Sequence, residues 1–258
     1  MTEKSQAFGL SPESSYTVPE SDYRKAIGPY FDSSAGTTLD KLKAFPRFVP
    51  RQDMAMLLAR AELFRLAAPV QGAFIECGVF MGTGLFTWAQ LSAIHEPYFH
   101  NRRVIGFDTF AGFPSLSAQD GAEDDLKRPQ GYEFSAIDEL RQGARLLDLN
   151  RPIGHLPKIE LVQGDAVETI PRYVEDNRHL VVALLYLDFD LYEPTLAALR
   201  HFLPRMPRGA VLAFDELNQK LWPGETVAVM EAVGVHKLAI RRFPFVPSMS
   251  YAILGEDS

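Results

Sequence analysis

The sequence has little cysteine and no long hydrophobic run. Cys77 is the only cysteine among 258 residues, so no disulfide can form within the chain, which suits a reducing compartment. No window of about 18 consecutive apolar residues is present, and residues 1–15 are polar, without the hydrophobic core of a secretory signal. These absences predict a soluble, cytoplasmic protein with no membrane partner.

Positive charge is also scarce. Lys and Arg total 26 against 33 Asp and Glu, a formal net charge of −7, and no basic run is longer than a pair such as Arg241–Arg242. Nucleic-acid-binding proteins usually carry a basic surplus or patch, so this balance counts against a nucleic-acid partner. With 47% hydrophobic and 23% charged residues, the composition is that of an ordinary globular protein, and the expected partner is a small molecule.

Hydrophobic patterning divides the chain into an irregular arm with short helical pieces, residues 1–45, and one domain, residues 46–258. In the domain, strand-length apolar runs alternate with helical patterns, which indicates an α/β fold with a mostly parallel sheet and helices on both faces. Residues 180–190 are too continuously apolar for a half-exposed strand and predict a central, buried one. The last two β-type runs predict an antiparallel hairpin at the sheet edge. Seven strands are expected, over 73–77, 103–108, 159–165, 180–190, 209–216, 236–243 and 248–254, with helices over 53–68, 84–94, 135–148, 167–174, 194–203 and 223–233.

Two segments stand outside this alternation. Residues 109–158 form a connection far longer than ordinary loops, which predicts a lid or binding segment. Its acidic residues Asp120 and Glu123–Asp125 are expected to form a solvated surface. The arm is expected to pack on a neighbouring subunit, which predicts a homo-oligomer.

A glycine-rich loop, Glu76-Cys77-Gly78-Val79-Phe80-Met81-Gly82-Thr83-Gly84, follows the first predicted strand. Its glycines fall where a backbone turns sharply and approaches a ligand closely, but their spacing is not the G-x-G-x-x-G of a dinucleotide site. An acid two residues before the first glycine would repel phosphate and favour a cationic ligand. The candidate cofactor-binding residues of the loop are Glu76, Gly78, Gly82 and Thr83.

Five consecutive predicted strands end in an acidic residue. Ligands of open α/β sheets bind at these carboxyl ends, although Asp is also a common helix N-cap, and for any single acid capping is an equally good explanation. Asp108 could accept both hydroxyls of a ribose, and Asp165 could accept from an adenine amino group. A ribose, a cationic group and no phosphate describe S-adenosylmethionine better than NAD.

Asp188, Asp215 and Glu216 form a second set at the same edge. Three converging carboxylates repel one another unless a cation neutralises them, and all-oxygen ligation selects a hard ion such as Mg²⁺ or Mn²⁺. Such an ion could lower the pKa of a bound substrate hydroxyl. The alternative is a solvated acidic rim.

The segments FIECGVFMGTG, VIGFDTFAGFP, YLDFDLYEPT and FDELNQKLWPGET, in this order, resemble the macrocin O-methyltransferase family over residues 47–254. The resemblance implies a Rossmann-like class I methyltransferase fold. It also implies a metal-dependent and S-adenosylmethionine-dependent enzyme that methylates sugar hydroxyls in antibiotic biosynthesis. Within the family the chain resembles the branch that acts on nucleotide-linked 6-deoxyhexoses such as TDP-rhamnose, which implies a deoxysugar substrate and its 3-hydroxyl.

The resemblance also implies roles for single residues. Asp188 matches the first metal aspartate, which is also the suggested base, with His155 and His236 as other possible bases. The pair Asp215–Glu216 matches one that is usually Asp-Asp, so the longer Glu216 could bind the ion or lie behind it. The Asp-Gly-Asp of the family is Asp-Phe-Asp here. The roles implied are cofactor binding for Glu76, Gly78, Gly82, Asp108 and Asp165. Asp190 and Trp222 are candidate substrate contacts because of their places in the sequence, one at the same strand end as Asp188 and the other shortly after Glu216.

Three other functions stay open. The acceptor could be a sugar already attached to an antibiotic aglycone. An NAD-dependent oxidoreductase would share the fold, but the missing G-x-G-x-x-G and the acid at Glu76 count against it. A non-catalytic nucleotide-binding protein would have no need of the second acidic set.

Overall fold

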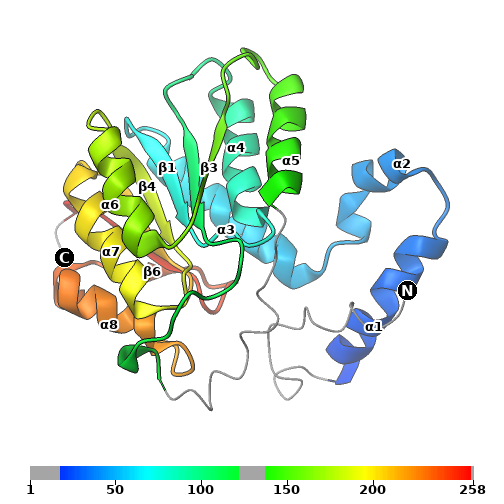
Figure 1. Ribbon diagram of the computed structural model, residues 1–258. Helices are drawn as coiled ribbons and strands as arrows, with labels where there is room; N and C mark the ends of the chain where they lie inside the picture. The colour runs from blue at the N-terminus through cyan, green and yellow to red at the C-terminus, as the bar shows by residue number, and fades with distance from the viewer. Residues whose placement is uncertain (1–17, 122–136, 257–258) are drawn as a thin grey trace. The chain divides into compact units, whose positions relative to one another are not determined.

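The computed structural model describes residues 18–121 and 137–256 (Figure 1), and the structural statements below apply to these ranges. The chain forms two compact units that divide between Ala55 and Met56. The first unit contains helix α1 (Val18–Ser33), longer than the short pieces expected, and helix α2 (Thr38–Lys43). A reciprocal capping box between Thr37 and Asp40 begins α2.

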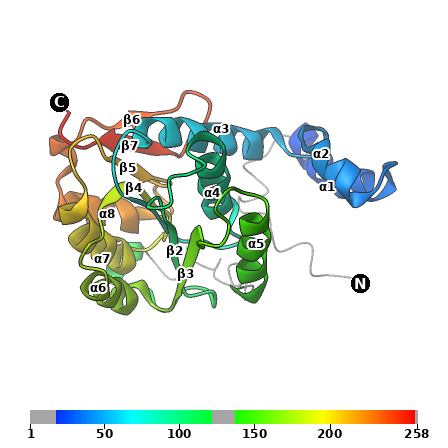
Figure 2. The same cartoon turned by 90° about the horizontal axis from the view of Figure 1, so that it is seen from above.

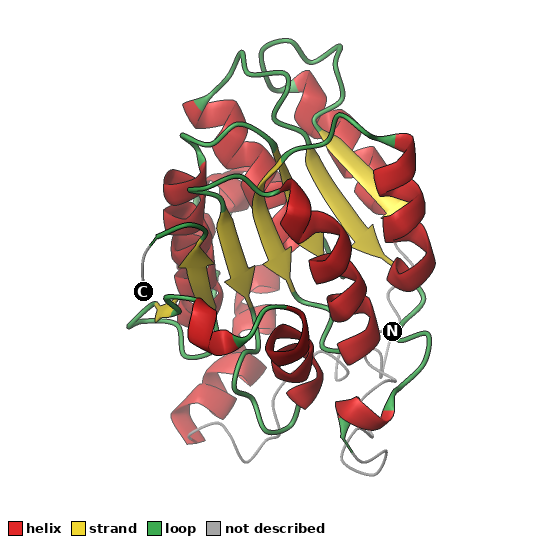
Figure 3. Ribbon diagram, turned by 90° about the vertical axis from the view of Figure 1, so that its left-hand side faces the viewer, coloured by secondary structure: helices red, strands yellow, loops and turns green. Residues whose placement is uncertain are grey.

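The second unit is built on a seven-stranded sheet in the order β3-β2-β1-β4-β5-β7-β6. The first five strands pair in parallel, and β7 is antiparallel to both β5 and β6. This confirms the predicted α/β fold with an antiparallel hairpin at one edge (Figure 3). The strands are β1 (Ala73–Cys77), β2 (Val104–Asp108), β3 (Ile159–Gln163), β4 (Val182–Leu187), β5 (Val211–Phe214), β6 (Arg241–Arg242) and β7 (Ser250–Ile253).

Helices cover both faces of the sheet, as Figures 1 and 2 show. The strand β4 is buried along its whole length, as its continuous apolar run predicts. In the described ranges no helix combines the length and the apolar composition needed to cross a bilayer. One face carries α3 (Arg51–Ala67), α4 (Thr83–His95) and α5 (Ile137–Leu149), and the other carries α6 (Ala166–Asp176), α7 (Tyr192–Phe202) and α8 (Pro223–Ala232).

The edge strand β6 is much shorter than the sequence predicts. Residues 236–243 were expected to form a strand, but only Arg241–Arg242 pair with β7. Val235–Lys237 form a 3₁₀ turn after Gly234, whose φ is 84°. Pro244 and Pro247 follow, and proline has no amide hydrogen to donate to a sheet ladder.

The expectation that Asp120 belongs to a solvated surface is wrong. Its side chain is 2% exposed. One carboxylate oxygen accepts from the backbone N–H of Tyr192 at 2.6 Å, and the other accepts from the N–H and hydroxyl of Ser117. Asp120 thus caps the start of α7, which satisfies an otherwise unpaired helical amide. Glu123–Asp125 lie outside the described residues.

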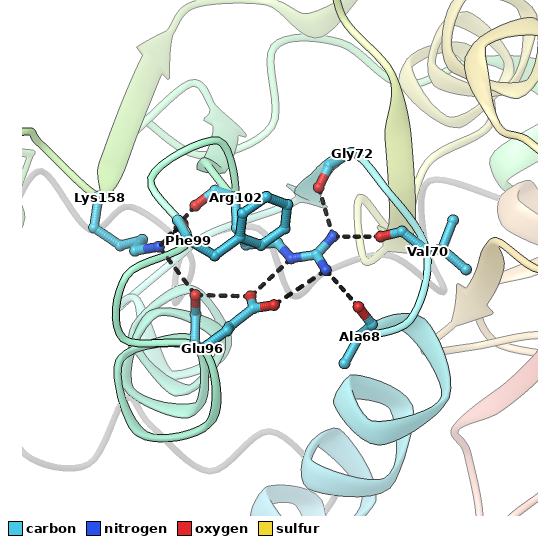
Figure 4. A network of polar contacts seen from close by, with 8 residues as sticks. Ala68, Val70, Gly72, Glu96, Phe99, Arg102 and Lys158 are labelled. Atoms are coloured by element: carbon cyan, nitrogen blue, oxygen red, sulfur yellow. Dashed lines mark hydrogen bonds and ion pairs between the residues drawn. The ribbon is translucent and has the colours of Figure 1, made fainter.

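A buried arginine, Arg102, lies at the amino ends of β1 and β2, opposite the carboxyl ends where the acids lie. Arg102 is 0% exposed, and all the N–H groups of its guanidinium have acceptors (Figure 4). The Nε and one Nη2 bond reach the carboxylate of Glu96, and the remaining bonds reach the carbonyls of Ala68, Val70 and Gly72. The side chain therefore joins the end of α3, the end of α4 and the start of β2.

Candidate active site

The glycine-rich loop after β1 is held by a carboxylate from β2. The Oδ2 of Asp108 accepts from the backbone N–H of Val79 at 2.7 Å and of Phe80 at 2.9 Å, and its Oδ1 accepts from the N–H of Phe110 at 2.7 Å. Phe80 and Phe110 both have positive φ, at 49° and 54°. The three bonds hold these backbone conformations, which are unfavourable for a bulky residue. The predicted ribose acceptor therefore also shapes the loop.

The structure explains why two positions of the loop are occupied by glycine. Gly78 has φ +95°, and a Cβ there would lie 1.9 Å from the carbonyl oxygen of Asp188, so only glycine lets the ends of β1 and β4 approach this closely. Gly82 is the left-handed N-cap of α4 and makes no side-chain cap. The first-turn amides of α4 consequently point at the carboxyl edge of the sheet without a side-chain partner from the cap, which suits the anionic end of a ligand.

Glu76 is buried rather than open to a ligand. Its side chain is 2% exposed, and a Cβ on Gly84 would lie 1.9 Å from its Oε1, which places the carboxylate against the first turn of α4. Burial raises its pKa to about 8, against the opposing attraction of Arg60. The positive charge that acts on Glu76 is therefore that of Arg60, a residue of the same chain. A contact between Glu76 and the cofactor stays a prediction.

Asp165 is the N-cap of α6. Its side chain accepts from the backbone N–H of Val167 at 2.9 Å, so one of its oxygens performs the capping that Asp commonly provides. The residue is half-buried, and its second oxygen is not part of that cap. Thr83, the last of the candidates for cofactor binding, is exposed in the first turn of α4.

The remaining acids gather where β4 and β5 end. Burial, with repulsion from Asp215 and Asp190, raises the pKa of Asp188 well above its usual range. Burial also raises the pKa values of Asp190 and Glu216, whose side chains share a hydrogen bond. Asp190 has φ 63°, so its carboxylate is presented by an unusual backbone conformation. The sequence predicts these acids at one edge of the sheet, and the repulsion between them agrees with that arrangement.

A further acid, Glu225, belongs to this group and was missed from the sequence. It is 0% exposed in the first turn of α8, and its Oε1 accepts from the backbone N–H of Glu216 at 3.1 Å. Its Oε2 and that of Glu216 are buried without a hydrogen-bond partner. The signal that could have found it is its place two residues after Pro223, which begins α8.

The donor set fits a hard cation in its chemistry. Clustered carboxylates with raised pKa values and buried oxygens lacking partners are the ligands and the electrostatic need that Mg²⁺ or Mn²⁺ would satisfy. Within the described residues, however, no three His, Cys, Asp or Glu side chains converge closely enough to hold an ion in their present positions. Binding would require side-chain rearrangement of Asp188 and Glu216 around Asp215.

Two more residues that the sequence analysis did not select lie beneath the acids. Arg60, from α3, is 6% exposed, and its Nη2 lies 3.5 Å from the hydroxyl of Tyr186, whose own hydroxyl donates to Asp215. Burial opposes the charge of Arg60, but Tyr186, Glu76 and Asp215 outweigh it and raise the pKa of the guanidinium. A signal existed, because Arg60 occupies the apolar helical stripe of Leu63, Phe64 and Ala67.

Trp222, a candidate substrate contact, is the N-cap of α8. It is 7% exposed, and its ring centroid lies 5.9 Å from that of Phe113, at the start of the predicted lid. Phe107 and Phe110, on either side of the end of β2, are buried core residues. Packing between Trp222 and Phe113 joins the long connection to the start of α8.

The buried acid Glu76 gives a prediction for the metal-free protein. The folded chain keeps its proton to about pH 8, whereas an ordinary glutamate releases it near 4.5, so folding stability should decrease as the pH rises between these values. The slope approaches about 1.4 kcal/mol per pH unit for this proton. Melting temperatures measured from pH 5 to 8.5 in a chelator should decrease with pH, and less steeply in Glu76→Gln. Equal slopes in the two proteins would contradict this assignment.

The chain is similar to a known family of methyltransferases and to solved structures. The family model of macrocin O-methyltransferase (TylF) matches residues 48–238. A solved structure of CalS11, a calicheamicin methyltransferase, is 33% identical and superimposes with a TM-score of 0.88, covering 93% of this chain and 95% of its own. An apo structure of CalS11, described as the TDP-rhamnose 3′-O-methyltransferase of calicheamicin biosynthesis, gives a TM-score of 0.82 over 93% of this chain and 97% of that one.

A third solved structure and a curated relative are less similar. The structure of the O-methyltransferase NovP is 22% identical, with a TM-score of 0.61 over 77% of this chain and 79% of its own, and shows the fold alone. A curated Streptomyces olivaceus protein, the 4′-O-methyltransferase of 8-demethyl-8-(2,3-dimethoxy-α-L-rhamnosyl)-tetracenomycin C, is 28% identical over 156 residues. That match spans 58% of this chain and only 55% of the relative's length.

Proposed function

The chain belongs to the macrocin O-methyltransferase family, and from this premise we propose that it transfers the methyl group of S-adenosylmethionine to a deoxysugar hydroxyl in antibiotic biosynthesis. The acceptor we propose is a nucleotide-linked 6-deoxyhexose such as TDP-rhamnose, methylated on its 3-hydroxyl. We further propose that the reaction depends on Mg²⁺ or Mn²⁺.

The observation that carries the proposal is the combination of two features at one edge of the sheet. One is the loop of residues 76–84, held open by Asp108, with the uncapped start of α4 beside it. The other is the cluster of buried acids at the ends of β4 and β5. The first suits a cofactor with a carboxylate and a ribose, and the second suits an ion that binds hydroxyl groups.

Each part of the site has a role in this reaction. S-adenosylmethionine supplies an electrophilic methyl group, and a divalent cation held by Asp188, Asp215 and Glu216 would make a sugar hydroxyl more acidic. Asp188 or a neighbouring acid such as Asp190 would accept the hydroxyl proton as the general base. The loop and the acids hold the two reactants in line, which supplies much of the acceleration.

Packing around the site serves to keep water out. Trp222 and Phe113 contact each other beside the start of α8, and Asp120 fixes the same part of the long connection to α7. Apolar walls of this kind orient a sugar ring and limit hydrolysis of the reactive methyl donor. We therefore assign Trp222 to the acceptor side of the site, together with Asp190.

A sugar already attached to an aglycone is the second candidate acceptor. The curated relative that acts on a rhamnosyl group of tetracenomycin C favours it, although this match covers only about half of that protein. The two candidates differ in charge, because a nucleotide-linked sugar carries a diphosphate. The matched CalS11 structures cover nearly the whole chain and favour the nucleotide-linked sugar.

A radiolabel-transfer assay tests both the reaction and its metal requirement. With labelled S-adenosylmethionine and Mg²⁺, we expect methyl transfer to TDP-rhamnose and at least about tenfold less transfer to a rhamnosylated aglycone, since loss of a paired charged group costs more than about 1.4 kcal/mol. EDTA should abolish transfer, and excess Mg²⁺ should restore it. Full activity in EDTA would remove the metal role, and a preference for the aglycone would reverse the choice of acceptor.

A further inference from the structure

Tyr186 lies directly beneath the acid cluster, and no step of the proposed reaction yet uses it. It is a β4 residue with 0% exposure, next to Glu76 of β1 and Ala213 of β5 in the sheet register. Asp215 follows Ala213 by two residues, and side chains two apart share a face of a strand. The phenol hydroxyl accordingly reaches Asp215 and donates a hydrogen bond to its Oδ1.

Arg60 fixes the direction of that hydrogen bond. Its Nη2 approaches the Tyr186 oxygen at 3.5 Å, and its guanidinium carbon lies 5.1 Å from the centre of the Tyr186 ring. A guanidinium offers donors and no acceptor, so the hydroxyl proton of Tyr186 has Asp215 as its acceptor. The ring itself is held by burial and by Trp88, whose ring centroid is 5.9 Å away.

We propose that Tyr186 is a positioning residue for the metal site. By donating to Oδ1 of Asp215, it holds that half-buried carboxylate in one orientation and leaves Oδ2 for an ion. Partners that orient a metal ligand in this way commonly contribute about 10–100-fold to metal affinity. The inference rests on the proposed function, because it requires that Asp215 binds a divalent cation.

The variant Tyr186→Phe removes the hydroxyl and keeps the ring. We expect the Kd of Mn²⁺, measured on the full chain from the electron paramagnetic resonance of free Mn²⁺ with S-adenosylhomocysteine present, to rise by about tenfold or more. The Kd of S-adenosylhomocysteine should stay unchanged. In a methyl-transfer assay the kcat should fall at low Mn²⁺ and recover as Mn²⁺ approaches saturation.

Tyr173→Phe is a matched control. Tyr173 is a partly buried tyrosine of α6 whose hydroxyl donates to a carboxylate, Glu160 of β3, at 3.0 Å. It also packs against another aromatic ring, that of Phe107 at 5.3 Å. The same chemical deletion here should leave the Kd of Mn²⁺ unchanged, so a general effect of losing a tyrosine hydroxyl is separated from an effect on the ion.

The outcomes separate this inference from the proposed function. Equal Mn²⁺ affinity in the native protein and Tyr186→Phe overturns the role of Tyr186 and leaves the metal dependence in place, as does an equal weakening in Tyr173→Phe. Absence of Mn²⁺ binding by the native protein overturns both. If Tyr186→Phe does not fold, Arg60→Lys keeps the charge but removes the guanidinium beside the hydroxyl. A weaker Mn²⁺ affinity in that variant supports the arrangement, and an unchanged affinity overturns it.

Discussion

Replacing Asp188 with asparagine is expected to lower kcat for methyl transfer by about 10³-fold or more. The substitution keeps the shape of the side chain but removes a negative charge that we assign both to the metal and to proton acceptance. A positioned general base alone contributes about 10²–10⁴-fold, and metal stabilisation adds several kcal/mol. Labelled S-adenosylmethionine and TDP-rhamnose at saturating Mg²⁺ measure the effect.

The same variant should be more stable than the native protein when no metal is present. Burial and the neighbouring acids raise the pKa of Asp188, so its charged form is unfavourable in the folded state at neutral pH. Asparagine removes that cost, and the melting temperature in EDTA should rise. Conversely, Mg²⁺ should raise the melting temperature of the native protein but not of the variant, since a ligand stabilises the state that binds it.

Asp176→Asn provides the control for both measurements. Asp176 is an exposed acid at the end of α6, away from the strand ends that carry the cluster. Its substitution should change kcat by less than about twofold and stability by less than about 0.5 kcal/mol. If Asp188→Asn retained native turnover, Asp188 would have neither catalytic role.

The strands, and the position of the acids at their carboxyl ends, could be predicted from the sequence because both follow from local patterns. The five-residue run 73–77 matches β1 at both ends, and the continuous apolar run around β4 predicted its burial. An acid placed after such a strand lies at the carboxyl edge of a parallel sheet. By contrast, the predicted length of β6 was wrong. The apolar pattern of residues 236–243 does not reveal the turn after Gly234 or the effect of the two nearby prolines on strand pairing.

The partners of the buried polar groups could not be predicted in the same way. Arg60 and Tyr186 are 126 residues apart in sequence, and only the packing of α3 on β4 brings them together. In the sequence Asp120 is one of several acids in a polar loop, but in the structure it accepts a hydrogen bond from the first backbone N–H of α7. Asp108 was assigned to a ribose from its position, and the structure adds three backbone amides to its partners. Periodicity predicts which face a residue occupies, but not which polar atom it meets there.

Arg102→Met is expected to lower the free energy of unfolding by about 3–5 kcal/mol, because it removes five hydrogen bonds that a buried guanidinium donates to the mostly buried carboxylate of Glu96 and to three backbone carbonyls. The side chain is fully buried, its guanidinium lies 4.5 Å from the Phe74 ring centre, and it bonds to Glu96 at 2.8 Å. Lysine should not rescue the variant, since one ammonium cannot reach acceptors spread over two sides of a planar guanidinium. Guanidinium chloride titration measures the change as a shift of the midpoint.

Arg65→Met separates this effect from the loss of an arbitrary ion pair. Arg65 pairs with Glu62 at 3.0 Å, but the two side chains are 70% and 50% exposed. Such surface pairs contribute about 0–1 kcal/mol, so this variant should unfold near the native midpoint. Arg102 lies at the opposite end of β2 from Asp108, so Arg102→Met that is still folded should keep native kcat at low temperature. Equal midpoints for the two variants would show that the buried network adds no more stability than a surface pair, whereas a loss of kcat in folded Arg102→Met would show that its effect extends along β2 to the loop of residues 76–84.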